Sequence, residues 1–125
     1  MPELDEEHQA MFRLLQDLRR AVLEGEGAAR LEPKAQRLAA ETTGHLRHEE
    51  GLLSGARYPQ VEWHKRQHAT ARAQLASLAD SIRTGEQATI FQSLEALAKW
   101  MRDHTSVADR MAGAYLRNHR RTLAR

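Results

Sequence analysis

Apolar residues recur along this 125-residue chain at alternating steps of three and four, the period of an α-helix that buries one face. Four segments carry this pattern, and short stretches containing glycine or proline separate them. We predict helices over residues 5–24, from Leu31 or Pro33 to residue 55, over 60–83 and over 87–116. The sequence contains no strand pattern. Four helices of this length with short connections predict an all-α fold, an up-down-up-down antiparallel four-helix bundle.

The apolar stripes of the four segments predict the core. They comprise Met11, Leu15, Leu18 and Val22, then Leu38, Thr42 and Leu52, then Val61, Ala71, Leu75, Leu78 and Ile82, and finally Ile90, Leu94, Leu97, Met101, Ala108, Met111 and Tyr115. The length suits one modest core, so we predict one domain over residues 1–125. Residues 117–125 form a basic tail, either a solvated end or a junction to a further signalling module.

The chain has seven histidines and no cysteine. The lack of cysteine excludes disulfide scaffolds, thiolate zinc sites, iron–sulfur clusters and cysteine nucleophiles. The 19 Lys+Arg against 17 Asp+Glu give a formal net charge of +2, too balanced for a dedicated binder of nucleic acid or membrane surfaces. No apolar run approaches the roughly 18 residues that a membrane span needs, and the first residues are acidic, unlike a signal peptide. We therefore expect a cytoplasmic protein.

Polar residues interrupt every apolar stripe. They are His8 on the first, His45 and Glu49 on the second, His64 and His68 on the third, and His104 on the fourth. Each costs a few kcal/mol in an apolar interior unless it is paired or bound. Asp109 follows His104 by five residues, a step that turns roughly 140° around a regular helix. Asp109 can join the others only through side-chain reach or a local π-type widening.

These seven side chains have the chemistry of metal ligands. The i, i+4 pairs His45 with Glu49 and His64 with His68 aim two donors at one point. Imidazoles and carboxylates without a thiolate suit iron, and on ligand softness also zinc, manganese or copper. Seven donors exceed what one ion uses, which favours two ions bridged by carboxylates.

In chain order the motif is H, then H-x-x-x-E, then H-x-x-x-H, then H-x-x-x-x-D. This motif, with its flanking residues 4–8, 49–53, 57–59 and 100–104, resembles bacterial hemerythrin over nearly the whole chain. The resemblance implies a non-haem centre of two iron ions with an oxo or hydroxo bridge that binds O2 reversibly, in a binding protein rather than an enzyme. It also implies that one iron is bound by His64, His68 and His104, the iron with an open position by His8 and His45, and both by bridging Glu49 and Asp109.

The chain departs from the family pattern beside two of the histidines, with Leu46 after His45 and Thr105-Ser106 after His104. A hydroxyl that reached the ligand pocket would accommodate water and speed oxidation of the metal. O2 storage, delivery or sensing is therefore the leading hypothesis, with NO or peroxide as alternative ligands. The alternatives are a di-iron peroxidase, oxidase or NO reductase, and a helical signalling module with a structural metal. No general acid or base is evident beyond the ligands, which disfavours an enzyme.

Other conspicuous side chains receive structural interpretations. We expect His48 and His119 at the rim or surface, and Glu50 exposed to solvent rather than bonded to a ligating imidazole. We expect packing roles for Tyr58, Trp63, Trp100 and Tyr115.

Overall fold

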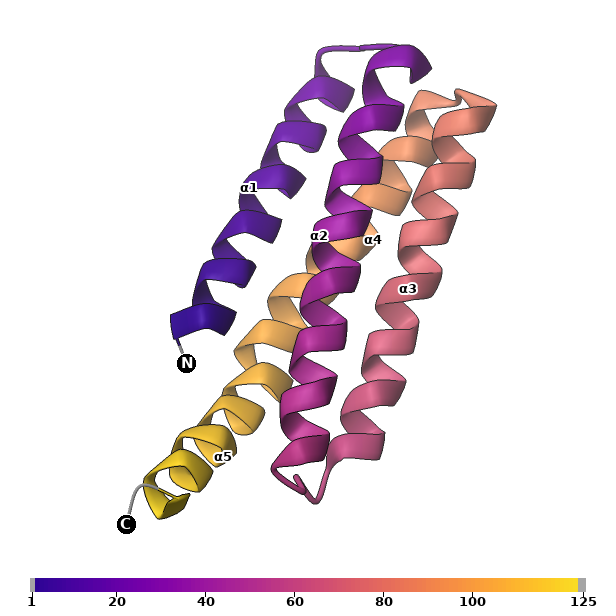
Figure 1. Ribbon diagram of the computed structural model, residues 1–125. Coiled ribbons are helices and arrows are strands. Elements are labelled where there is room, and N and C mark those ends of the chain that lie inside the picture. The colour runs from indigo at the N-terminus through magenta and orange to yellow at the C-terminus, as the bar shows by residue number, and fades with distance from the viewer. Residues whose placement is uncertain (1, 124–125) are drawn as a thin grey trace.

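The computed structural model describes residues 2–123, which are helical apart from short connections (Figure 1). The helices are α1 (Pro2–Leu23), α2 (Ala28–Gly55), α3 (Val61–Thr84), α4 (Gln87–Ser106) and α5 (Ala108–Leu123). No strand occurs within residues 2–123, so the prediction of an all-α fold is confirmed. None of the helices over these residues combines the length and apolar character that a membrane crossing needs.

The helices pack into a bundle. α2 packs against α1 and α3, and α4 packs against α3 and α1, which closes the ring. The α1–α2 and α3–α4 connections lie at one end of the bundle and the α2–α3 connection at the opposite end (Figure 1). α5 continues beyond α4 toward that second end and also contacts α2.

Two of the predicted helix ends lie at glycines in the left-handed conformation. Gly25 follows α1 with φ 75°, and Gly85 caps α3 with φ 78°, a conformation that other residues adopt at a cost. The first two helices begin earlier than predicted. α1 begins at Pro2 instead of residue 5, because proline suits a first turn, and α2 begins at Ala28, which leaves Pro33 inside the helix.

The prediction of one continuous helix over residues 87–116 is wrong. A turn at Val107, with φ −116° and ψ −69°, separates α4 from α5. The interruption changes which residues face inward, so the buried side of α5 includes Ala108, Ala112 and Leu116. Met111, predicted in the core stripe, is 51% exposed for this reason.

The predicted basic tail is helical as far as Leu123, and residues 124–125 lie outside the described part of the chain. Arg120 of this segment pairs with Glu3, with 2.5 Å between Nη2 and Oε1. The last helix is thereby tied to the first.

The core consists of two apolar clusters. The larger contains the buried Leu18, Leu38, Ile82 and Leu94 and takes residues from α1 to α4. The smaller comprises Leu4, Leu53, Ala56, Tyr58, Ala112 and Leu116. Of the predicted core residues, Leu52, Val61 and Tyr115 are half-buried, Met111 is exposed and all others are buried. Along α1 and α2, the polar residues singled out by the sequence lie between residues of the larger cluster and residues of the smaller one. His104 and Asp109 lie in the same way between Met101 of the larger cluster on α4 and Ala112 of the smaller cluster on α5.

Candidate metal centre

The structure brings all seven predicted donors together, in two groups that share two carboxylates. One group is Glu49, His64, His68, His104 and Asp109, and the other is His8, His45, Glu49 and Asp109. Within each group the potential ligand atoms lie within 4.8 Å of one another. His8 is half-buried and the other six side chains are buried. Every helix of the bundle contributes at least one donor.

Glu49 reaches both groups with different oxygens. Its Oε1 lies 3.1 Å from His68 Nε2 and also contacts His64 Nε2. Its Oε2 lies 3.8 Å from His45 Nε2. The carboxylate, which is 1% exposed, therefore spans the space between the two groups.

Asp109 spans the same space from the opposite side of the bundle. Its Oδ1 lies 2.9 Å from His104 Nε2 and 3.2 Å from His64 Nε2. Its Oδ2 lies 3.0 Å from His8 Nε2, which is itself 3.0 Å from His45 Nε2. Each carboxylate thus turns one oxygen toward two histidines of the first group and the other toward one histidine of the second.

The turn at Val107 is what allows Asp109 to join. We expected side-chain reach or a π-type widening, and the helix is instead interrupted and restarted at Ala108. Asp109 then lies in the first turn of α5, where it faces inward and is 8% exposed.

Several buried atoms of this cluster that could bind a metal have no hydrogen-bond partner, among them Glu49 Oε2, His104 Nε2 and Asp109 Oδ1. His104 Nε2 and Asp109 Oδ1 are 2.9 Å apart without hydrogen-bond geometry. Neighbouring ligands about 2.1 Å from a common octahedral ion are separated by about 3 Å. An orphaned buried polar atom is costly, so these atoms fit metal ligation.

The cluster strongly attracts positive charge. Burial alone would lower the pKa of His64, but its contacts with Asp109 and Glu49 outweigh burial and raise that pKa to about 9. Burial alone would raise the pKa of Asp109, but its close contacts with the imidazoles of His104, His64 and His8 hold that pKa well below its usual range. Contacts with His64 and His68 likewise outweigh burial and lower the pKa of Glu49. Both carboxylates are therefore ionised at neutral pH and require compensation by protons or a cation.

Comparison with known proteins agrees with this geometry. The family model described as the hemerythrin HHE cation binding domain matches residues 2–116. The chain belongs to the hemerythrin family. No curated protein and no solved structure matched the chain in the corresponding comparisons.

In this hemerythrin, two ring nitrogens that face away from the centre are held by carboxylates. His45 Nδ1 donates to Glu7 Oε1 at 2.8 Å, and the other oxygen of Glu7 accepts from His48 Nδ1 at 2.8 Å. His68 Nδ1 donates to Glu50 Oε2 at 2.6 Å, and Arg72 Nη2 donates to the same oxygen at 3.0 Å. An acceptor for the outer N–H keeps the Nε2 lone pair free for a metal and orients the ring.

A third ring nitrogen is held by an amide, because His104 Nδ1 donates to Gln67 Oε1 at 2.9 Å. Sequence reasoning missed Gln67 and Glu7, since neither is part of a periodic motif. The expectation that Glu50 is exposed is wrong. Its side chain is 19% exposed and accepts a hydrogen bond from His68 on the neighbouring helix α3. His48 is at the rim as expected, with its side chain 38% exposed.

Replacement of Glu50 by alanine leaves His68 Nδ1 without its acceptor. We expect metal affinity to fall about 10- to 100-fold with little change in helix content, the usual effect of losing a partner of a ligating imidazole. Competition with a metal chelator measures the affinity. The control is Glu41→Ala, an exposed glutamate on the same helix, which should leave affinity unchanged. Equal affinities for the two variants would contradict a positioning role for Glu50.

A small cavity of about 190 Å³ adjoins the His8 side of the centre. Its lining includes His8, Glu49, Thr105, Asp109 and Arg117. Of the two hydroxyl residues that follow His104, Thr105 thus reaches a cavity beside the donors. Ser106 is exposed, and its hydroxyl donates to the Arg102 carbonyl at 2.8 Å.

Proposed function

We propose that this hemerythrin is an up-down-up-down antiparallel four-helix bundle that holds two iron ions and binds O2 reversibly, for storage, delivery or sensing. The observation that supports this proposal is that the two oxygens of each shared carboxylate face different groups of histidines. Glu49 and Asp109 each direct one oxygen to His64 and its neighbours and the other toward His8 or His45. Two carboxylates used in this way would bridge two ions.

The numbers of donors favour one complete and one incomplete coordination sphere. His64, His68 and His104, with two carboxylate oxygens and an oxo or hydroxo bridge, would fill six positions. His8 and His45 with the same bridging groups would fill five, which would leave one position for a small ligand. The cavity beside His8 and Asp109 adjoins this half.

Charge balance agrees with two divalent ions. Two ferrous ions carry four positive charges, against two carboxylates and one hydroxide. The net positive charge that remains is small enough for a buried site. When bound, iron would supply the redox chemistry that O2 binding needs, while the surrounding residues hold the imidazoles in place and exclude bulk water.

Metal analysis of protein purified anaerobically from iron-supplied cells tests the proposal, together with visible spectra before and after air is admitted. We expect two irons per chain and charge-transfer bands that appear with O2 and disappear on its removal. Two irons that oxidise at once and never return would overturn reversible O2 binding. One zinc without a visible spectrum would leave a helical module with a structural metal.

A second candidate, a di-iron enzyme acting on peroxide or NO, is favoured by one observation. Thr105 places a hydroxyl-bearing side chain beside the donors, where it would accommodate water and polar ligands. Thr105→Val keeps the shape and removes the hydroxyl, so under this candidate both peroxide turnover and the rate of oxidation in air should fall. Ser106→Ala is the control, because Ser106 faces solvent. Absence of turnover in the wild type would reject the enzyme.

A further inference from the structure

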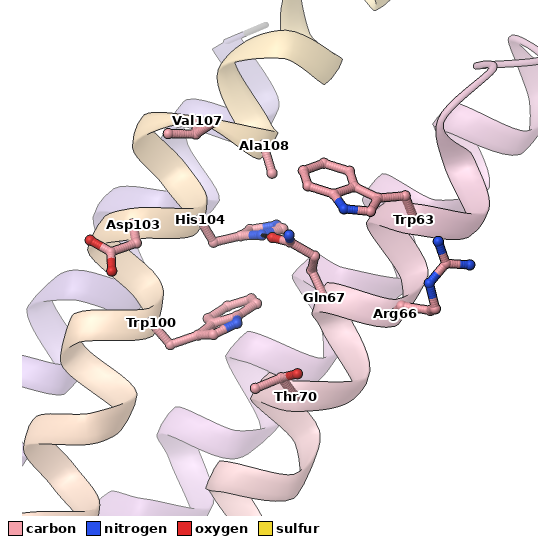
Figure 2. Close-up of a pocket in the computed structure, with 9 residues that line it drawn as sticks. All are labelled: Trp63, Arg66, Gln67, Thr70, Trp100, Asp103, His104, Val107 and Ala108. Atoms are coloured by element: carbon pink, nitrogen blue, oxygen red, sulfur yellow. Dashed lines mark hydrogen bonds between the residues drawn. The ribbon is translucent and has the colours of Figure 1, made fainter.

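A second recess, separate from the cavity beside His8, lies between α3 and the α4–α5 junction, with a volume of about 540 Å³ (Figure 2). We call it the tryptophan groove. Its lining is Trp63, Arg66, Gln67 and Thr70 from α3, Trp100, Asp103 and His104 from α4, and Val107 and Ala108 at the junction. The volume lies within the range of about 300–1,000 Å³ typical of small-molecule sites.

One aromatic wall of the tryptophan groove, Trp100, is held in place by a neighbouring ring. Trp100 stacks on the His104 ring, with 4.4 Å between ring centroids and 13° between planes. Trp63 lies on the opposite side of the groove, and His104 and Gln67 lie between the two indoles in Figure 2. Two half-buried indoles on facing helices offer broad apolar surfaces to a planar ligand.

The polar groups of the groove are mainly hydrogen-bond donors. Gln67 uses its oxygen for His104, which leaves its amide NH2 for a ligand. Arg66 is exposed, and no carboxylate within residues 2–123 forms an ion pair with it. Asp103, the carboxylate at the rim, is paired with Lys99, with 2.5 Å between Nζ and Oδ2. The groove therefore suits a planar ligand that carries ring acceptors and a negative charge.

We propose that the tryptophan groove binds a planar aromatic anion of the flavin mononucleotide class. The ring system lies against the indoles of Trp63 and Trp100, a ring carbonyl accepts from the Gln67 amide, and the phosphate pairs with Arg66. An adenine nucleotide fits less well, because its exocyclic amine is a donor and would face other donors. This proposal does not depend on which metal the hemerythrin centre holds.

Calorimetric titration of the purified protein, as isolated, with flavin mononucleotide tests the proposal. We expect binding that weakens about tenfold or more in Trp63→Leu, from lost stacking, and in Arg66→Gln, from the lost phosphate contact. Riboflavin lacks the phosphate, so Arg66→Gln should not change its affinity. Adenosine monophosphate should bind at least tenfold more weakly than the flavin nucleotide.

Arg37→Gln is the matched control, since Arg37 is an exposed arginine on α2, outside the groove. Trp63 is half-buried and Arg66 is exposed, and circular dichroism checks that both variants retain the wild-type fold. The proposal is overturned if the wild type does not bind the flavin nucleotide. It is equally overturned if binding is the same in the wild type, Trp63→Leu and Arg66→Gln.

Discussion

Glu49→Ala should reduce the metal content of this hemerythrin from two ions per chain to at most one, while the protein remains helical. Both donor groups share Glu49, so its loss removes a ligand from each at once. The fold should persist because both apolar clusters lie outside the donor set. Elemental analysis gives the stoichiometry, and circular dichroism reports the helix content.

Asp109→Ala should have the same effect, since Asp109 is the other shared carboxylate. Two controls separate the bridging role from a general loss of packing. Glu49→Gln keeps the volume of the side chain and removes its charge, and this variant should also fail to hold two metal ions. Glu41→Ala removes an exposed glutamate from the same helix and should keep two ions. Two ions per chain in both alanine variants would contradict the assignment of Glu49 and Asp109 as bridging ligands.

Removal of the metal should lower the melting temperature by about 10 °C or more. A ligand present at about a thousand times its dissociation constant stabilises the native state by about 4 kcal/mol. For a domain of this size, each kcal/mol moves the melting temperature by about 3–5 °C. The metal-free protein must also keep Glu49 and Asp109 ionised at 1% and 8% exposure, compensated only by protonated histidines such as His64.

Scanning calorimetry before and after treatment with a chelator measures this effect, with metal removal verified by elemental analysis. Addition of the metal should restore the original melting temperature. His119 lies outside both donor groups, so His119→Ala should show the same loss and recovery of melting temperature as the wild type. An unchanged melting temperature in verified metal-free protein would show that the bundle does not depend on its centre.

The helical segments were predictable because a single signal, the helical period, was strong in each of them. The same signal exposed the donors, since a histidine at a position such as His64 breaks an otherwise apolar stripe. The break at Val107 could not be predicted in this way. Residues 104–109 contain neither glycine nor proline, and the interruption becomes evident only when Asp109 is seen facing the histidines of three other helices.

Contacts between helices were the other part that sequence reasoning missed. Glu50 follows Glu49 directly and has no periodic signature, and its role is evident only because His68 lies opposite on α3. The tryptophan groove has the same origin. Trp63 and Trp100 were expected to serve in packing, and only the structure shows that both also line a recess between α3 and α4.

The division of the core into two apolar clusters has a consequence for cooperativity. The smaller cluster joins the end of α2 and the middle of α5 to the start of α1, and the polar layer separates it from the larger one. Without a cation, repulsion between Glu49 and Asp109 weakens the link between the two halves. We expect the end that contains Leu53 and Leu116 then to open while the rest stays closed, and its amide hydrogens to exchange faster. Metal bound at the shared carboxylates should make the two halves unfold as one unit.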